Sequence, residues 1–356
     1  MEKSKVALMK TTPETVVRDY WKLMNLAEYQ KFISKDVDTI LKLNLSWSLY
    51  YPGCSTQPWQ LDGVISALKA DRYTKIRAVE NKTVVTDPWL GCSQNKWNRV
   101  LEKHSMKFEP LTDVEWGKYK IKKELTAIPR IFPEGHEIPK MFLGKNIIHL
   151  PTVKTHGHTV ITGAIKNSFG GLITEKRHHC HKMIHEVLVD LLTIQQELHP
   201  GIFAVMDGTV AGTGKGPRTF KPIVKNLIAA SADQVAIDAV EAALMGFDPM
   251  KIPFIKMSHD KGLGCGDLSQ IEIVGENIEG FKFKAATGKS PVIYFDQLFR
   301  KKLPFIERYL FHTKLFKLCV FGSEFYHDKL WYNVVGKKRI NDFIKKTEWG
   351  LLFEKY

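Results

Sequence analysis

Short apolar runs alternate with longer segments of helical spacing along most of this chain, and this alternation strongly limits its fold. In the first half, the runs at 37–45 and 75–80 have strand character, and the segments at 58–68 and 93–104 have helical character. The same order returns in the second half. Strands are expected there at 147–153, 201–207, 226–231 and 271–275, and helices at 180–198 and 233–245. Because strands that alternate with helices form parallel sheets covered by helices, we predict an α/β protein with a mostly parallel sheet.

The domain organisation is predicted from length and from a change in composition. The 356 residues exceed the usual size of a single core, so we expect two Rossmann-like lobes, an N-terminal α/β lobe at 1–145 and a C-terminal α/β lobe at 146–288. From Lys289 onward the alternation stops, and aromatic residues are interleaved with basic ones. Because these aromatic side chains can bury much apolar area, 289–356 is predicted to be an ordered extension that packs on the core. It would cover a cleft there or form a homodimer contact. Weak docking on an anionic membrane surface is the alternative.

The charge balance limits the class of partner. The chain has 52 Lys and Arg against 38 Asp and Glu, a formal net charge of +14. This excess suits an anionic small molecule, an anionic membrane surface or nucleic acid. Without a zinc finger, a long basic run or a recognisable RNA-binding motif, no nucleic-acid partner is expected. No run approaches the roughly 18 apolar residues that span a bilayer, and charges interrupt the first residues, so a cytoplasmic protein is expected.

The five cysteines do not form a disulfide pattern. They are odd in number, widely spaced and lack a CxxC motif, which favours a reduced protein. Cys54, Cys92 and Cys265 each lie beside glycine in segments expected to be loops. They could therefore converge on an iron–sulfur cluster or act as redox thiols, and the alternative is ordinary buried packing.

The end of the strand at 147–153 carries the first candidate site. Lys154 and His156 follow this apolar run directly, and residues two apart on a strand point the same way. Lysine can hold an anion or act as a base, and histidine can move protons near neutral pH. We therefore predict that both are catalytic.

The segment from Lys166 to Gly171 is the second candidate. It combines a cation, the amide of Asn167 and the flexible backbone at Gly170. Glycine lets backbone amides approach an anion closely, although the sequence is not a Walker A loop. A turn that binds phosphate or carboxylate is predicted; a purely structural turn is the alternative.

Two aspartates complete the predicted catalytic set. Asp207 and Gly208 end an expected strand, where α/β proteins place ligands, and a glycine-rich loop at 211–217 follows them. Asp238 lies on an alanine-rich helix otherwise made of apolar residues. Because an unpaired buried carboxylate is costly, Asp238 is expected to meet a cation such as Lys154 or Lys166, or to line the pocket.

A histidine cluster is the metal candidate. His178 lies just before His181, and His185 follows His181 by one helical turn. The i, i+4 spacing would place His181 and His185 on one helix face, which is a spacing known from metal sites. The alternative is that these histidines are exposed to solvent at the start of a helix and bind no metal.

The chain resembles the family catalogued as domain of unknown function 362 over roughly 37–276, and the resemblance is clearest in the second half. The motifs that carry the resemblance are Leu150-Pro-Thr-Val-Lys154-Thr-His156, Gly163-Ala-Ile-Lys-Asn-Ser-Phe-Gly170, Val205-Met-Asp-Gly208, Ala230-Ser-Ala-Asp233 with Asp238, and Gly262-Leu-Gly264. Weaker agreement reaches Lys42-Leu-Asn44 and Val79-Glu80, and His158 matches no motif. The resemblance implies that Asn44 and Gly208 belong with the ligand-binding residues. It implies no settled reaction.

These observations favour an enzyme, an oxidoreductase or isomerase that performs redox or proton-transfer chemistry on an anionic small molecule or cofactor. Lys154, Lys166 and Asn167 would hold the anion, and His156 would move protons. Asp207 and Asp238 would orient these groups or a metal. The sequence does not identify a cofactor, and it leaves a metal ion and an iron–sulfur cluster as the two open alternatives. The alternatives are a non-catalytic binding protein for a nucleotide, phosphate or cofactor, and an electron-transfer protein built on the cysteines.

Overall fold

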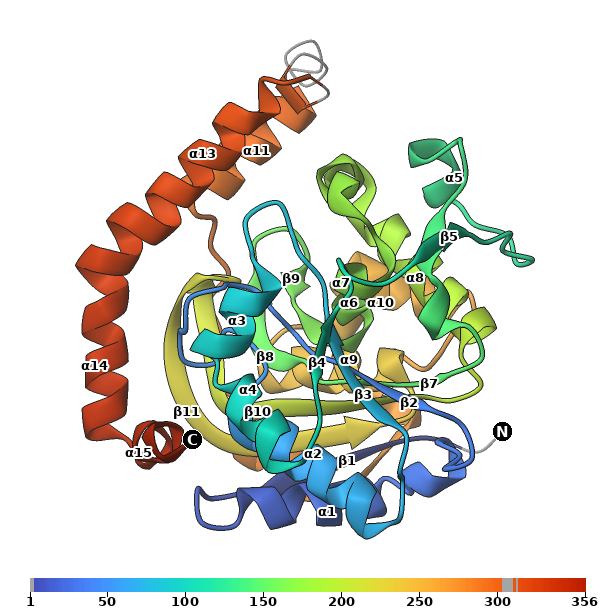
Figure 1. Cartoon of the computed structure of the whole chain (residues 1–356), viewed down its shortest axis with the longest axis vertical. Helices are drawn as coiled ribbons and strands as arrows, with labels where there is room; N and C mark the ends of the chain where they lie inside the picture. The colour runs from blue at the N-terminus through green and yellow to red at the C-terminus, as the bar shows by residue number, and fades with distance from the viewer. Residues whose placement is uncertain (1–2, 303–309, 312) are drawn as a thin grey trace.

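One sheet forms the centre of the molecule in the computed structural model, which describes residues 3–302, 310–311 and 313–356 (Figure 1). Residues 303–309 and 312 of the predicted extension lie outside the described residues. The ten-stranded sheet has the order β12 (Ile271–Gly275), β1 (Ser4–Lys10), β11 (Thr219–Ser231), β10 (Ile202–Lys215), β7 (Asn146–His149), β2 (Thr39–Lys42), β3 (Ile76–Glu80) and β4 (Phe108–Pro110). Off this path, β8 (Thr152–His156) pairs with β10 and with β9 (Val160–Ile161).

Most strand pairs are parallel, as predicted. The run from β10 through β7, β2 and β3 to β4 is parallel throughout, and β1 pairs with β12 in parallel. The antiparallel pairs lie around β11, which pairs with β1 and β10, and between β8 and β9. The sheet is therefore mixed and largely parallel.

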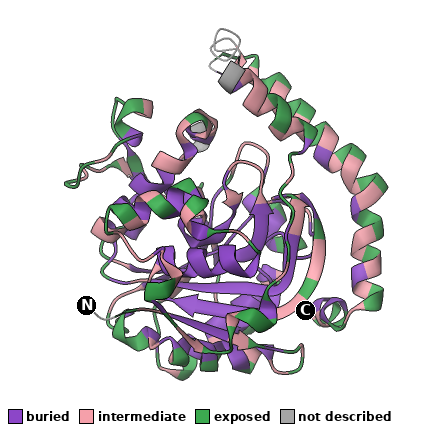
Figure 2. Ribbon diagram, turned by 180° about the vertical axis from the view of Figure 1, so that it is seen from behind, coloured by how far each residue is buried: buried purple, intermediate pink, exposed green. Residues whose placement is uncertain are grey.

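Helices cover both faces of the sheet, and the two hydrophobic cores lie between them and the strands (Figure 2). One core includes residues of α1 (Val16–Leu26), α2 (Pro58–Ala70), α3 (Pro88–Gln94) and α4 (Trp97–Lys103). The other includes residues of α5 (Ile128–Ile131), α6 (Gly163–Asn167), α7 (Phe169–Leu172), α8 (Ile184–Leu198), α9 (Gln234–Leu244) and α10 (Pro253–Asp260). A small hairpin, β5 (Trp116–Lys118) with β6 (Glu137–Pro139), stands apart from the main sheet. Six 3₁₀ segments complete the core: η1 (Tyr29–Lys31), η2 (Lys140–Phe142), η3 (Glu175–Met183), η4 (Pro249–Lys251), η5 (Leu268–Gln270) and η6 (Ile278–Phe281).

The two predicted Rossmann-like lobes are not confirmed. Strand β7, from the expected second lobe, pairs with β2 from the expected first lobe, so strands from both share one sheet. The reason is physical: strand–helix alternation is the same whether a chain extends one sheet or begins another.

The predicted glycine-rich loop at 211–217 belongs largely to a strand. Strand β10 continues from Ile202 to Lys215 and forms a long hairpin with β11. A Cβ at Gly212 would lie 2.7 Å from a ring atom of Phe220, so glycine here permits close packing inside a strand. Because the strand does not end at Asp207, this residue lies within β10 and not at the rim of the sheet.

The chain order creates a switch point between β2 and β7. From β2 the chain moves through β3 to β4 on one side, and then returns to place β7 on the other side of β2. Open α/β sheets bind ligands outside the carboxyl ends of the strands at such a point. Lys42 and His149 occupy the carboxyl ends of these two strands.

The C-terminal arm, defined here as 291–356, runs along one side of the body (Figure 1). It contains α11 (Pro291–Lys302), α13 (Phe316–Glu324), the π-helical segment η7 (Phe325–Gly336), α14 (Lys337–Lys346) and α15 (Glu348–Lys355). Its end is anchored to the core, where the Trp349 ring lies 5.1 Å from that of Trp59 and Phe353 stacks on Tyr50 at 3.7 Å. Among the described residues, none of the helices has the length and apolar character that crossing a membrane requires.

Candidate functional site

A cavity of about 530 Å³ lies at the carboxyl ends of β2 and β3, next to the switch point. Its inner wall comes from these strand ends and from the α6–α7 segment. Its outer wall comes from η3, from the turn between β10 and β11, and from α11, α13 and η7 of the arm. The arm therefore covers a site that the sheet creates.

A chain of buried amides and imidazoles lies between the cavity and the sheet. Asn44 Nδ2 donates to Asn167 Oδ1 at 3.2 Å, and Asn167 Nδ2 donates to the Lys42 carbonyl at 2.9 Å. Asn167 Nδ2 is also 3.3 Å from His149 Nδ1, and His149 Nε2 is 2.5 Å from Gln195 Oε1. These contacts fix Asn44 and Asn167, both of which line the cavity.

Lys154 is hydrogen-bonded to this buried series of side chains through Asn44. Its side chain is fully buried, and its Nζ donates to Asn44 Oδ1 at 2.8 Å and to Thr152 Oγ1 at 2.6 Å. Burial lowers the pKa of Lys154 to about 8. Lys154 thus contacts a residue of the cavity wall and does not itself line the cavity.

A buried ion pair forms one side of the cavity. Lys42, at the end of β2, donates to Glu80 Oε1 at 2.7 Å, and both side chains are buried. Burial lowers the pKa of Lys42, while the Glu80 carboxylate acts in the opposite direction. A cation buried at this cost needs its partner, so the pair fixes the carboxyl ends of β2 and β3 relative to each other.

Helix α6 brings Lys166 to the cavity. Asp238 on α9 accepts hydrogen bonds from the Ala164 and Ile165 backbone amides at 2.5 and 3.1 Å, and thereby caps the start of α6. Gly163 has a φ of +68°, and a Cβ there would lie 2.4 Å from Asp238 Oδ2, so the close approach requires glycine. Burial, to which the charge of Asp233 adds, raises the pKa of Asp238 to about 8, and the two amides oppose this rise.

The Lys166 ammonium has no hydrogen-bond or ion-pair partner among the described residues. The side chain lines the cavity and is partly buried, and its Nζ lies 5.9 Å from the centre of the Phe169 ring. Burial first, and then the charges of Lys154, Arg177 and Lys42, lower the pKa of Lys166 to about 7. Lys166 can therefore exist in either protonation state near neutral pH.

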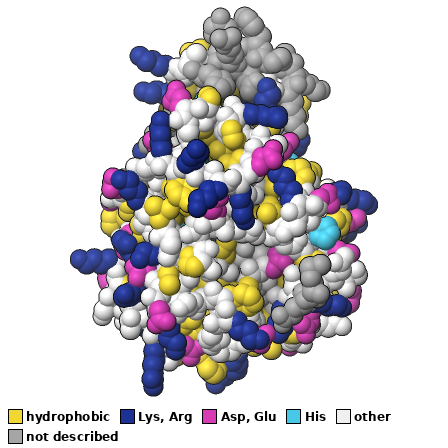
Figure 3. Space-filling model, turned by 90° about the vertical axis from the view of Figure 1, so that its right-hand side faces the viewer, with side chains coloured by type: hydrophobic (Ala, Val, Ile, Leu, Met, Phe, Trp, Pro, Cys, Tyr) yellow, Lys and Arg dark blue, Asp and Glu magenta, His cyan; other side chains and the backbone are white. Residues whose placement is uncertain are grey.

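The cavity lining is cationic. Arg177, Lys215 and Arg218 line it together with Lys42 and Lys166, against the carboxylates of Glu80 and Asp296. Arg218 Nη1 is buried without a hydrogen-bond partner, although its Nε donates to the Ser46 carbonyl at 3.1 Å. By contrast, the face in Figure 3 carries Lys and Arg side chains interspersed with Asp and Glu. The cavity is thus a place where an anion would meet several cations.

Histidines form the wall next to the arm. His156, His158, His178 and His181 line the cavity, and the rings of His158 and His181 stack at 4.7 Å. Burial and nearby cations lower the pKa of His158 and of His181 to about 3, and that of His156 well below its ordinary value. These rings are therefore neutral at physiological pH.

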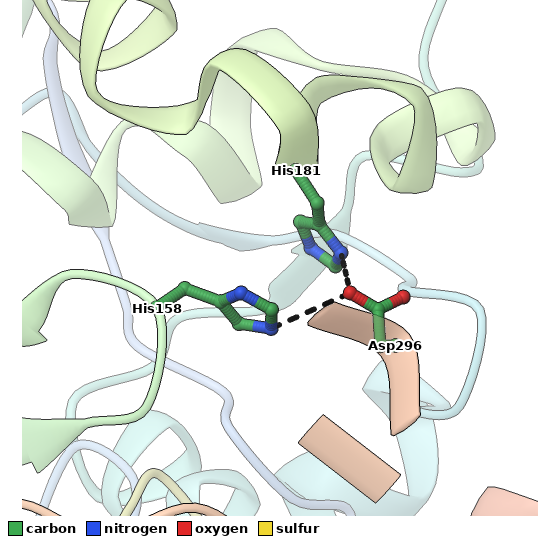
Figure 4. A group of neighbouring side chains, drawn as sticks. All are labelled: His158, His181 and Asp296. Carbon is green, nitrogen blue, oxygen red and sulfur yellow. Dashed lines mark ion pairs between the residues drawn. The ribbon is translucent and has the colours of Figure 1, made fainter. Parts of the chain in front are cut away.

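His158, His181 and Asp296 form a group in which the three potential ligand atoms lie within 4.8 Å of one another (Figure 4). Asp296 Oδ2 is 3.9 Å from His158 Nε2 and 3.8 Å from His181 Nδ1. In this group, His158 comes from the segment after β8, His181 from η3 and Asp296 from α11 of the arm.

The structure gathers some of the predicted site residues and separates others. His156, Lys166, Asn167, Gly170 and Asn44 line the cavity, as do His178 and His181. His185 does not line the cavity, and its ring stacks on that of Phe254 at 6.0 Å. The predicted helix at 180–198 begins only at Ile184, and His181 belongs to the preceding 3₁₀ segment. His181 and His185 therefore do not share one helix face.

Asp207 and Gly208 lie away from the cavity. The Asp207 carboxylate accepts hydrogen bonds from Tyr20 at 2.6 Å, from Trp59 at 2.9 Å and from Thr209 at 2.7 Å. Burial raises its pKa, and these donors oppose the rise. A Cβ at Gly208 would lie 2.8 Å from the Leu227 side chain, so glycine serves close packing there.

The three cysteines proposed for a cluster have separate surroundings. Cys54 donates to the Pro217 carbonyl at 3.2 Å, Cys92 lies in the core of the α1–α2 face, and Cys265 lies 3.5 Å from the Asp267 carbonyl. Burial raises the pKa of Cys54 to about 11 and that of Cys92 to about 12. In the described part of the chain, none of them belongs to a group with metal-ligand spacing.

Several cavity residues were not predicted as site residues. Lys42 ends an apolar run and Glu80 ends a strand, and a charge at a strand end is a signal that could have been used. Arg177 and Arg218 lie in segments without a regular pattern. Asp296 lies in the arm, and nothing in its local sequence relates it to histidines more than a hundred residues earlier.

Comparison with known proteins supports the resemblance found in the sequence. The model of the family described as "Domain of unknown function (DUF362)" matches residues 39–243, which include β2, the α6–α7 segment and α9. A relative, the thylakoid-associated protein sll1697 of Synechocystis sp., is 29% identical over 124 residues. The match spans 33% of this chain and 37% of that protein, so it covers about a third of the relative's length. No solved structure gives a significant match.

Proposed function

The chain belongs to the DUF362 family, and we propose that it is an enzyme that binds an anionic small molecule in the cavity and transfers a proton to or from it. The observation that supports this most is Lys166, an ammonium group that has no hydrogen-bond or ion-pair partner in the described ranges and lies in a cavity that other cations line. An anion would supply the missing partner.

The proposed roles follow from the surroundings of each group. Lys166, Arg177 and Arg218 would bind carboxylate or phosphate oxygens, with the amides of Asn44 and Asn167 fixing the orientation. A lysine with a pKa near 7 can also accept or release a proton at neutral pH. His156, which is neutral, is the second group that could carry the proton, since its Nδ1 accepts from the His158 amide at 3.2 Å and leaves Nε2 for the ligand.

The test begins with anion binding to the full chain. Sulfate, phosphate, pyrophosphate and small di- and tricarboxylates would be screened by thermal shift, and the binders measured by calorimetry. We expect Lys166→Met to weaken binding by about tenfold or more, because a charge-assisted hydrogen bond is worth roughly 1.5–3 kcal/mol. Lys221→Met, which removes an exposed lysine of β11, is the matched control and should bind as the parent does. Equal affinity in both variants would contradict the anion site.

Catalysis is tested separately from binding. Carboxylates that bind would be incubated with the protein in D₂O, and loss of their C–H signals would be followed by NMR. Exchange that depends on Lys166 or His156 supports proton transfer. Tight binding without exchange would favour a binding protein instead.

A second candidate, association with an anionic membrane surface, rests on the arm. Leu318, Phe321 and Phe325 are 64%, 67% and 55% exposed and lie at helical spacing, and Lys314 and Lys317 are exposed beside them. Apolar side chains flanked by lysines suit a surface of anionic headgroups. One relative is named as thylakoid-associated, which supports the same proposal. Sedimentation with lipid vesicles tests it.

A further inference from the structure

We propose that His158, His181 and Asp296 bind one divalent first-row transition-metal ion, and that the C-terminal arm completes this site by supplying the carboxylate. The inference does not depend on which anion the cavity binds, or on whether it binds one.

The three ligand atoms are close enough to share an ion, although the carboxylate is too far from either ring for a hydrogen bond. Both distances from Asp296 Oδ2, 3.9 Å to His158 Nε2 and 3.8 Å to His181 Nδ1, are too long for hydrogen bonds. Donor atoms about 2.0–2.2 Å from a tetrahedral ion lie roughly 3.4 Å apart, so shifts of a few tenths of an ångström would suffice for these two pairs. Figure 4 shows the two rings and the carboxylate converging on the space between them.

Within the described part of the chain, two of the three ligand atoms are buried without a hydrogen-bond partner. These are His181 Nδ1 and Asp296 Oδ2. Unsatisfied buried polar atoms are uncommon in folded proteins, and a bound ion is one of the ordinary explanations for them. Two such atoms that face each other across 3.8 Å point to the same missing species.

Neighbouring groups fix the carboxylate and the segment that carries His158. The other oxygen of Asp296, Oδ1, accepts from Arg300 Nε at 2.9 Å, which fixes the carboxylate and leaves Oδ2 for the ion. Gln297 Nε2 donates to the Gly157 carbonyl at 3.0 Å and lies 3.3 Å from His158 Nδ1, so the residue after Asp296 holds the backbone next to His158.

The charges around the two rings disfavour an ion pair as the explanation of the cluster. A pair of imidazolium ions would be unfavourable here, because the rings stack at 4.7 Å and Arg300 and Lys166 lie close by. An ion pair between protonated histidine and Asp296 is therefore the weaker explanation of the cluster.

The donor set defines the class of ion. Two imidazole nitrogens and one carboxylate suit Zn²⁺, Fe²⁺, Co²⁺ or Ni²⁺, whereas Mg²⁺ and Ca²⁺ prefer oxygen alone. Three protein ligands leave at least one coordination position open. Since all three residues line the cavity, that position faces the space where an anionic ligand would lie.

The experiment measures metal binding by the full chain after treatment with a chelator. Zn²⁺ would be titrated by calorimetry, and Co²⁺ by its visible absorption spectrum. We expect one equivalent of either ion to bind, with no competition from excess Mg²⁺. The Co²⁺ spectrum should lack the intense sulfur charge-transfer band, because the site has no thiolate. Such a band would assign the ion to a cysteine, for example Cys319 in the same cavity, and would overturn the proposal.

Matched variants locate the ion. Asp296→Asn keeps the shape of the side chain and should weaken binding of Zn²⁺ and Co²⁺ by a hundredfold or more, as should His158→Ala. The control is His178→Ala, which lines the same cavity outside the group and should change affinity by less than threefold. Circular dichroism would verify the fold of each variant, and the nearly isosteric Asp296→Asn decides the matter if His158→Ala does not fold. Failure of the parent chain to bind either ion, or equal affinity in Asp296→Asn and the parent, would overturn the proposal. Neither result would bear on the effect of Lys166→Met on anion binding.

Discussion

Lys166 gives the cavity a dependence on pH at the scale of one residue. Its pKa is about 7, so it is largely protonated at pH 6 and largely neutral at pH 8.5. An anion binds the protonated form better, so affinity should be greatest below pH 7 and fall as the pH rises through this value. Sulfate is a suitable probe because its own charge does not change over this range. We expect its dissociation constant to rise about tenfold between pH 6 and pH 8.5, which corresponds to roughly 1.4 kcal/mol.

The same titration in Lys166→Met identifies the group responsible. Without this ammonium, the fall near pH 7 should disappear. A smaller fall near pH 8 would remain if Lys154, whose pKa is about 8, acts through Asn44. His156, His158 and His181 stay neutral throughout this range and should not contribute. An unchanged profile in Lys166→Met would assign the pH dependence to another residue.

At the residue scale, the sequence predicted much of the inner wall and little of the outer wall. Lys166 and Asn167 were recognisable because a cation, an amide and glycines follow one another within six residues. Asp207 shows the limit: its position depended on where the strand ends, and β10 continues for eight residues beyond it. Asp296 shows another limit, since its histidine neighbours come from distant segments that only the fold brings together.

At the element scale, Asp238 should influence the cavity through α6. Asp238→Ala removes both acceptors from the start of this helix, and buried amides without partners cost about 1–3 kcal/mol. We expect the free energy of unfolding to fall by about 2 kcal/mol. The affinity for sulfate should fall severalfold, because α6 positions Lys166. Chemical denaturation and calorimetry measure the two effects.

Asp190 offers a matched control for this prediction. It is buried on α8 and accepts from the backbone amides of Thr126, Ala127 and Ile128, near the start of α5. Asp190→Ala should therefore destabilise the protein to a similar extent. Because α5 does not line the cavity, sulfate affinity should stay as in the parent. If both variants lose affinity equally, the effect of Asp238 is general destabilisation and not positioning of α6.

The sequence predicted the elements better than their arrangement. Strands β2, β3 and β12 and helices α2 and α9 lie where apolar spacing placed them, whereas β10 and β11 extend well beyond the predicted ranges 201–207 and 226–231. Strand β1 was missed, because its apolar run is only four residues long and has a lysine on each side. The Pro151 position divides one predicted strand into β7 and β8, which pair differently along the sheet.

At the scale of the whole molecule, the arm determines how the protein would meet a membrane. The proposal predicts that the full chain sediments with vesicles that contain phosphatidylglycerol and not with neutral phosphatidylcholine vesicles. Phe321→Glu should reduce the bound fraction severalfold, since it places a charge where apolar contact is expected. Leu351→Glu is the matched control, because Leu351 is 53% exposed but lies on α15, away from the row at 318–325. Equal sedimentation of both variants with the parent would contradict docking through this face.

The buried series of hydrogen bonds beneath the cavity runs in one direction, from donor to acceptor. Lysine can only donate, so Asn44 presents its oxygen to Lys154 and its nitrogen to Asn167, which in turn directs its nitrogen toward His149. His149 Nδ1 must then accept, so the proton of this ring resides on Nε2. Gln195 Oε1 accepts the hydrogen bond from Nε2 at the far end of the series. This one-way series is therefore held at two points, by the ammonium of Lys154 and by the Lys42 carbonyl, which accepts from Asn167 Nδ2 at 2.9 Å. Replacing Lys154 by a residue that cannot donate would leave Asn44 Oδ1 without this donor, while the Lys42 carbonyl would still fix the direction of the series from Asn167 onward.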